Sequence, residues 1–220
     1  MSKIASQAIK ASGMACDAIL DIATNICSCK FAGKIAGKAA SQLADTTEEA
    51  TKMDEAATYE SIQDAISKLD SKWKVFGIRI RNEGTDNLCQ NTFGWCNVHL
   101  IDADNQQIYQ GILPEVGSPS TSNERVTYDE IPPIDFTAEG AMKNIEACKA
   151  LIPAEYKFLN LQDYVVTFDK REKRMETEVT INVQEIGKEK IEANGVTEEV
   201  YDSLHFTVNP DGSVSCRELD

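Results

Sequence analysis

The composition of this 220-residue chain changes abruptly at Asp45. Residues 1–44 consist mostly of Ala, Ser, Gly, Ile and Cys, with Lys as the main charged residue. Five lysines and two aspartates give this segment a formal net charge of +3, so a whole-chain charge of −14 leaves −17 for residues 45–220. Such asymmetry is typical of a segment that meets a partner. We therefore expect two parts, a cationic arm (residues 1–44) and an acidic body (residues 45–220).

Apolar and small residues in the arm recur at spacings of three and four, the period of one helix face. Its second half contains a row of small residues, namely Ala32, Gly33, Ala36, Gly37 and Ala40. Such a row lets two helix backbones approach closely. The pattern predicts one or two helices whose small-residue row contacts another helix, either in a protein partner, in a second copy of the chain or in the body itself. Charged residues interrupt the arm too often for a membrane-spanning helix.

The body is expected to begin with a helix and to continue as strands. A capping-box pattern at residues 46–49 predicts a helix that begins near residue 45 and runs to about residue 69, with Ile62, Ile66 and Leu69 on its inward face. From Trp73 onward the apolar residues alternate with a period of two, which predicts a strand with a kink at Gly77.

Turn-forming clusters separate the later elements of the body. The apolar runs 93–101 and 107–113 flank residues 102–106 and predict an antiparallel hairpin. Thr137 is the expected N-cap of a helix that ends before Pro153. Strands are expected at 156–161, 164–169 and 177–186, followed by a short helix around 197–204 and a closing hairpin that turns at 209–212. This order predicts an α+β fold, in which helices pack on one face of a largely antiparallel sheet.

Two features of the body could form a ligand site. The irregular segment 114–135 is longer than a simple connection needs, so it is the best candidate for a functional loop or lid. Five aromatic residues of the first strands could line a pocket beneath it: Trp73, Phe76, Phe93, Trp95 and Tyr109. A core between helices and a sheet needs the same residues, and the core is the favoured interpretation.

Residues 170–174 are the only basic cluster in the body, with four cations around one glutamate. Such a cluster could bind phosphate or an acidic partner. Because it lies at the tip of a predicted hairpin, simple solvation of the turn is the favoured interpretation.

Metal and cofactor signatures are weak throughout the sequence. Seven scattered cysteines without a signal peptide favour reduced thiols and a cytoplasmic protein. The pair Cys27 and Cys29 lacks the further ligands that zinc requires, and Asp102 with Asp104 lacks the glycine and the terminal glutamate of a calcium loop. The only two histidines, His99 and His205, lie in separate predicted strands. We therefore expect neither a metal site nor a cofactor.

Three functional hypotheses follow from these patterns. The leading one is a non-catalytic interaction or assembly protein, whose arm packs against a protein partner or a second copy of the chain. The first alternative is a membrane-surface or membrane-inserting effector that uses the amphipathic arm. The second is a small-molecule-binding or hydrolytic enzyme with a pocket on the sheet, which is less favoured because GxSxG, HExxH and P-loop motifs are missing. The strong negative charge argues against nucleic-acid binding.

Overall fold

The computed structural model describes residues 51–84, 90–193 and 196–219. By internal contacts the chain divides into two units, Met1–Thr47 and Glu48–Asp220, and every described residue belongs to the second unit. The predicted arm, its small-residue row and the capping-box pattern at 46–49 therefore lie outside the described residues.

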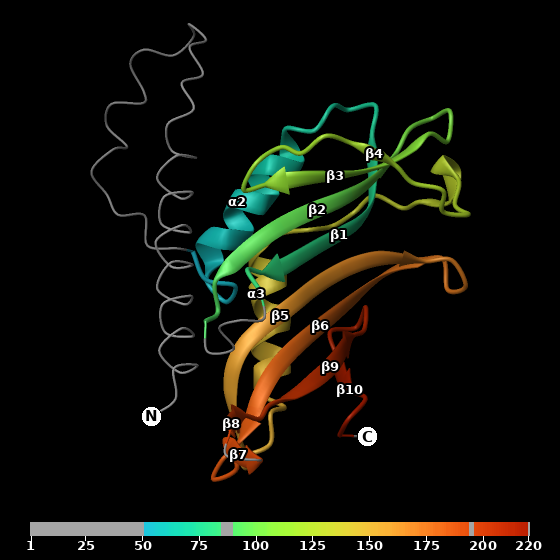
Figure 1. The fold of residues 1–220 in the computed structure, drawn as a ribbon. Coiled ribbons are helices and arrows are strands. Elements are labelled where there is room, and N and C mark those ends of the chain that lie inside the picture. The colour runs from blue at the N-terminus through green and yellow to red at the C-terminus, as the bar shows by residue number, and fades with distance from the viewer. Residues whose placement is uncertain (1–50, 85–89, 194–195, 220) are drawn as a thin grey trace, which may run out of the picture. The chain divides into compact units, whose positions relative to one another are not determined.

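Eight strands form one antiparallel sheet in the order β10-β9-β6-β5-β1-β2-β3-β4, which Figure 1 shows as a strongly curved layer. These strands are β1 (Lys74–Asn82), β2 (Phe93–Ile101), β3 (Gln107–Leu113), β4 (Ser120–Thr121), β5 (Tyr156–Asp169), β6 (Arg174–Glu185), β9 (Asp202–Val208) and β10 (Val214–Cys216). A separate two-stranded sheet pairs β7 (Lys190–Ala193) with β8 (Val196–Glu199).

Two α-helices, α2 (Ala56–Ser67) and α3 (Ala138–Lys149), lie behind this sheet in the view of Figure 1, and a short 3₁₀-helix, η1 (Tyr128–Glu130), precedes α3. The architecture is therefore α+β with a largely antiparallel sheet, as predicted. Thr137 is the N-cap of α3, as expected, because its Oγ1 accepts a hydrogen bond from the backbone N of Gly140 at 3.1 Å. Within the described ranges, neither helix has the length and apolar character to cross a bilayer.

The main core lies between the helices and the sheet face that they cover. Ile78 and Ile80 of β1 are fully buried in the same cluster as Tyr59 and Ile62 of α2 and Ile145 of α3. Alternation along β1 places every second side chain on this face, which is how an antiparallel sheet buries one side only. Burial of these apolar side chains is the dominant stabilising term of the fold.

The segment 114–135 is anchored over one end of the sheet and is not a free lid. Gln107 Nε2 donates hydrogen bonds to the carbonyl oxygens of Glu124 (2.9 Å) and Val126 (3.0 Å), and Lys74 Nζ donates to that of Tyr128 (2.9 Å). A second, smaller core cluster lies beneath the segment: Phe76, Ile101, Val126, Ile131 and Phe168. These contacts tie the segment that was predicted as a functional loop or lid to the sheet.

Several local predictions are confirmed. The hairpin of β2 and β3 has the predicted bounds, and Asp102 Oδ1 closes its turn by accepting from the backbone N of Asp104 and Gln106. The register between β1 and β2 shifts between Val75 and Gly77, where the kink was expected. The closing hairpin of β9 and β10 also forms around the predicted turn.

Residues 51–55, which the predicted first helix includes, are not helical, because α2 begins at Ala56. The residues before it are held by the sheet instead. Lys52 forms a β-bridge with Thr92, the backbone N of Met53 donates to the carbonyl of Asn91 at 2.7 Å, and Thr58 Oγ1 donates to the carbonyl of Lys52 at 2.6 Å. Pairing with a distant segment thus overrides the local helical pattern.

The predicted helix around 197–204 is also wrong, because this stretch forms β8 and the start of β9. Strand β8 pairs with β7, and β9 pairs with β6 over seven residue pairs from Thr177–Val208 to Val183–Asp202. The two separate strands expected at 156–161 and 164–169 are one strand, β5, with two bulges. In both cases the pairing with a neighbouring strand decides the element.

Candidate functional site

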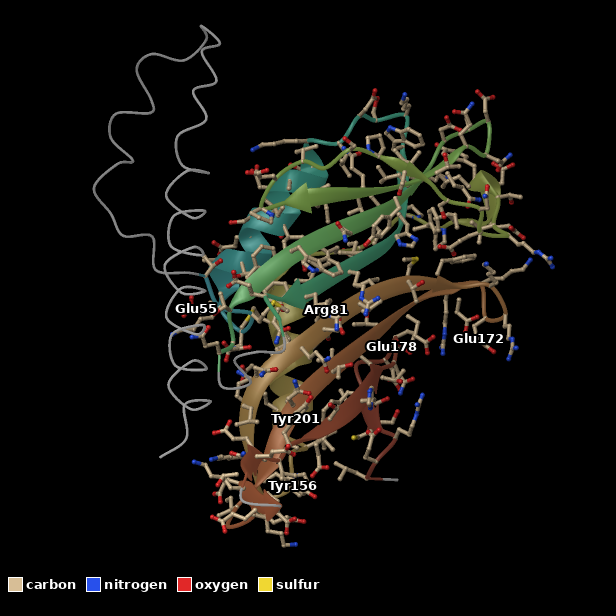
Figure 2. All side chains as sticks on the ribbon, viewed as in Figure 1. Glu55, Arg81, Tyr156, Glu172, Glu178 and Tyr201 are labelled. Carbon is tan, nitrogen blue, oxygen red and sulfur yellow. The ribbon has the colours of Figure 1, made fainter. Side chains whose placement is uncertain are left out.

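The sheet face opposite to the helices, here called the open face, carries polar side chains over its centre. In β1, Arg79 and Arg81 project to this face between the buried residues Ile78, Ile80 and Asn82. Figure 2 shows Arg81 and, further along the sheet, the labelled Glu178 and Tyr201. The described helices leave this face uncovered (Figure 1), so its chemistry is accessible to a partner.

Asp163 of β5 is a buried carboxylate on the open face that lies beside two arginines of β1. Its side chain is only 12% exposed, and it accepts hydrogen bonds from Arg79 Nε at 3.1 Å and from Arg79 Nη2 at 3.4 Å. Arg81 Nε lies 3.9 Å from the same carboxylate. The hydrogen bond to Asp163 raises the pKa of Arg79 and outweighs the opposing effect of burial. Two guanidinium groups share one carboxylate, so these three side chains together carry a net charge of +1.

A bulge in β5 turns Asp163 toward the open face. The pairing of β5 with β6 shifts between Leu161 and Asp163, so Gln162 is the extra residue. Without the shift, Asp163 would project to the same side as Leu161, which is buried in the main core. Bulges commonly redirect side chains in this way. The bulge therefore places the carboxylate opposite Arg81, its Cα partner on β1.

A row of buried side-chain amides continues from this ion pair toward β9. Asn160 Oδ1 accepts from Asn182 Nδ2 at 3.0 Å and from Asn82 Nδ2 at 3.3 Å, and Ser203 Oγ donates to Asn182 Oδ1 at 2.8 Å. Each of the three asparagines is less than 10% exposed. Buried amides that hydrogen-bond to one another are held in fixed orientations.

A hollow of about 200 Å³ lies beside this amide row. Two aromatic residues, Trp95 and Tyr201, and one cation, Arg81, border the polar floor. The complete lining is Arg81, Asn82, Glu83, Gly84, Trp95, Asn160, Gln162, Asn182 and Tyr201. The hollow can therefore accept a single polar or aromatic group that both stacks and hydrogen-bonds.

Both histidines are oriented by glutamates that are distant in sequence. Nδ1 of His99 lies 2.8 Å from Glu124 Oε1, and the ring contacts Tyr109 edge-on with a centroid distance of 4.8 Å. Nδ1 of His205 lies 2.8 Å from Glu218 Oε1. Within the described residues, neither ring hydrogen-bonds to a hydroxyl or thiol nucleophile, and no cluster of three or more metal-binding side chains occurs.

The predicted aromatic pocket does not form, because its members divide between separate environments. Trp73 and Phe93 pack against the main core, and Phe76 belongs to the second cluster. Trp95 borders the hollow of the open face, and Tyr109 contacts the ring of His99, which Phe76 contacts as well. The favoured interpretation of these residues as core residues is thus correct for three of them.

Sequence reasoning missed the open face. Arg79, Asp163 and the three asparagines had no motif in common, and only the period-two alternation of β1 hinted that two arginines share one side. The proposed contact row, Ala32, Gly33, Ala36, Gly37 and Ala40, lies outside the described residues, so the structure does not bear on it. No protein family, curated protein or solved structure matches this chain. The open face is therefore interpreted from its own chemistry.

Proposed function

We propose that this chain is a non-catalytic interaction protein, and that the open face of its sheet binds a protein partner. The observation that carries the proposal is that the partly exposed Trp95, Tyr201 and Arg81 border one hollow. Arg81 also lies beside the buried Asp163, which pairs with Arg79. Trp, Tyr and Arg are the residues that contribute most binding energy at protein interfaces. The hollow between Trp95 and Tyr201 supplies the pocket into which such an interface inserts an anchoring side chain.

The charges of the open face specify the kind of partner. Arg79 and Arg81 form a cationic stripe on β1, and Glu176 and Glu178 form an anionic stripe two strands away on β6. A partner with the reverse order of charges fits this pattern, because complementary stripes set the orientation of binding and exclude other partners. A polyanion does not fit, since the anionic stripe repels it.

A second copy of the chain has the required reverse order. In a twofold-symmetric dimer the same patch meets itself, so the arginine stripe of one copy faces the glutamate stripe of the other. The net charge of −14 opposes such a dimer at long range, and salt screens this repulsion. The proposal therefore includes a second copy of the chain among the protein partners of the open face.

The arm adds a second proposed contact. Packing through Ala32, Ala36 and Ala40 rests on the sequence pattern alone and is independent of the open face. The membrane-surface alternative depends on the same segment and also stays a prediction.

Site-specific photo-crosslinking tests the proposal. Trp95→p-benzoylphenylalanine places the crosslinker at the hollow, and Lys68→p-benzoylphenylalanine places it on the exposed end of α2 as the matched control. In the cells that make the protein, we expect a discrete light-dependent adduct at position 95 only. A doubled mass identifies a second copy, and any other mass identifies a different protein partner.

The adduct should depend on the arginine stripe. Arg81→Glu is expected to reduce it strongly, whereas Arg171→Glu, a matched reversal in the turn between β5 and β6, should not. Lack of an adduct at position 95, or an equal adduct from position 68, would contradict the proposal.

A further inference from the structure

The hollow on the open face has the size of a site for one side chain. Its volume of about 200 Å³ is below the range of about 300–1,000 Å³ that is usual for small-molecule sites. Protein interfaces gain most of their binding energy from a few residues that fill small, desolvated pockets. The chemistry of the lining therefore indicates which kind of side chain a partner inserts.

Arg81 belongs to a row of three residues that crosses the sheet from β2 to β5. Its Cα partner on β2 is Trp95, and its Cα partner on β5 is Asp163. Residues that are directly opposite in an antiparallel sheet place their side chains next to each other on the same face. Arg81 is therefore flanked by an aromatic wall of the hollow on one side and by a buried carboxylate on the other.

The buried carboxylate does not occupy the hydrogen-bond donors of Arg81. Asp163 accepts from Arg79 Nε at 3.1 Å and from Arg79 Nη2 at 3.4 Å, whereas Arg81 Nε lies 3.9 Å away, beyond hydrogen-bond distance. In the described part of the chain, Arg174 Nε is the only buried side-chain nitrogen or oxygen without a partner, so solvent reaches the unbonded nitrogens of Arg81. The side chain of Arg81 is 36% exposed and lines the hollow. Its donors are thus available to an acceptor from another molecule.

The charges favour an acceptor with a single negative charge. Arg79, Arg81 and Asp163 together carry a net charge of +1, and the two hydrogen bonds between Arg79 and Asp163 leave this charge on Arg81. A carboxylate neutralises it and matches the guanidinium with two parallel hydrogen bonds. A phosphate group carries up to about two negative charges and is repelled more strongly by Glu83, an exposed residue that also lines the hollow. A carboxylate therefore fits better than a phosphorylated side chain.

The rest of the lining fits the short stem of an acidic side chain. Trp95 and Tyr201 supply aromatic surface, and Asn160 and Asn182 belong to the floor, where Asn182 Nδ2 donates to Asn160 Oδ1 at 3.0 Å. Aromatic rings bury methylene groups and exclude water, which strengthens hydrogen bonds inside the hollow. Burial of an unpaired anion there would be unfavourable, and the guanidinium of Arg81 provides the pairing.

We propose that the partner of the open face inserts an aspartate or glutamate side chain into this hollow, where its carboxylate pairs with Arg81. Trp95 and Tyr201 cover the stem of the inserted side chain, and the buried amides form the floor beneath it. This inference rests on the proposed function, because it names the kind of residue by which a protein partner is anchored.

Titration of the full chain with two matched probes tests the anchor. The probes are the N-acetyl α-amides of glutamate and of glutamine, which differ in charge but hardly in shape. The signal is the indole N–H of Trp95 in two-dimensional NMR spectra, and the indole of Trp73, which packs against the main core, is the internal control.

We expect the glutamate probe to shift the Trp95 signal saturably, with a Kd of about 1–10 mM for a ligand of this size. The glutamine probe should bind about tenfold more weakly or less. Equal shifts from both probes, or no saturable shift with the glutamate probe, would overturn the proposal. Tighter binding of the N-acetyl α-amide of phosphoserine would also overturn it, in favour of a phosphorylated side chain.

Variants then locate the bound carboxylate. Arg81→Gln should weaken binding of the glutamate probe about tenfold, whereas Arg171→Gln, which removes an exposed arginine of the turn between β5 and β6, should leave it unchanged. Arg81→Gln is expected to fold, because Asp163 keeps its two hydrogen bonds from Arg79. Full binding by Arg81→Gln, or an equal loss in Arg171→Gln, would place the carboxylate elsewhere and refute the anchor.

The photo-crosslinking experiment separates failure of the anchor from failure of the proposed function. A light-dependent adduct at position 95 without binding of the glutamate probe would refute the carboxylate anchor and leave the protein partner in place. Binding of the glutamate probe without any adduct would refute the protein partner and, with it, the anchor.

Discussion

Arg79 of β1 donates through Nε to Oδ1 of Asp163 of β5 at 3.1 Å, although the two residues lie 84 positions apart in the chain. The carboxylate is 12% exposed and the guanidinium 45% exposed, so the pair is only partly desolvated. Pairs of this kind stabilise little by themselves, but removal of one partner leaves the other group uncompensated. Removal of either charged side chain is therefore expected both to destabilise the centre of the sheet and to change the net charge of the open face.

Replacing Asp163 should destabilise the protein. Asp163→Asn removes the only carboxylate that Arg79 and Arg81 share, so the two guanidiniums repel each other without compensation. We expect the free energy of unfolding to fall by about 1–2 kcal/mol in urea titrations. The matched control is Glu178→Gln on the same face, which is exposed and should change stability by about 0.5 kcal/mol or less. Equal effects of the two variants would rule out a special role of the ion pair.

Glu218 should stabilise the folded protein at neutral and mildly acidic pH, and this stabilisation should disappear at strongly acidic pH. Burial acts to raise the pKa of Glu218, but hydrogen bonds from the backbone N and the ring of His205 outweigh it and lower the pKa to about 2. Since the ordinary value is 4.5, the unfolded chain binds this proton more readily than the folded one. The stabilisation is therefore complete above about pH 4.5 and is lost as the pH falls toward about 2.

The variant Glu218→Gln isolates this contribution. Its urea midpoint should change less between about pH 5 and pH 2 than that of the unmodified protein. The matched control, Glu178→Gln, should keep the original acid dependence. Identical pH profiles for Glu218→Gln and the unmodified protein would show that the carboxylate does not carry the effect.

The buried cysteines should resist alkylation in the folded protein. Burial raises the pKa of the Cys96 thiol and of the Cys148 thiol to about 12, so only about one thiol in ten thousand is ionised at about pH 8. Mass spectrometry after brief treatment with iodoacetamide should find both residues unmodified. In denaturant without a reducing agent, all seven cysteines should react, and fewer would contradict the prediction of reduced thiols.

The body should fold without the arm. Among the described residues, the main core cluster runs from Met53 to Cys216 and already joins both described α-helices to the sheet. A fragment of residues 45–220 should therefore unfold cooperatively in thermal melts followed by circular dichroism. A broad, non-cooperative melt would show that the arm belongs to the core and that the predicted division into two parts is wrong.

Self-association through the arm should depend on its small residues. Ala36→Leu separates two helix backbones that pack along the row, whereas Ala36→Ser keeps the side chain small. Sedimentation velocity should show loss of oligomers for Ala36→Leu and retention for Ala36→Ser. A dimer that persists in Ala36→Leu but is lost in Arg81→Glu would assign the contact to the open face, and a monomeric unmodified protein would refute both routes to a homo-oligomer.

Short-range signals in the sequence were sufficient for the hairpin of β2 and β3, for the cap of α3 at Thr137 and for the last hairpin. In each case the turn or cap residues act within a few positions of the chain, so the pattern contains the physical cause. A short helix was predicted around 197–204. This stretch nevertheless forms strands, because β7 and β6 supply hydrogen-bonding partners that local propensity does not include.

The sequence by itself determined an acidic α+β body, the face that β1 buries and most of the local turns, because alternation, caps and turns are set by neighbouring residues. Only the tertiary structure decided where the functional groups meet. The bulge at Gln162 turns Asp163 to the arginines of β1, and the pairing of β5 with β6 brings Asn160 and Asn182 within hydrogen-bond distance. Both arrangements depend on strand register and on contacts between segments distant in sequence, which a periodic pattern along one segment does not encode.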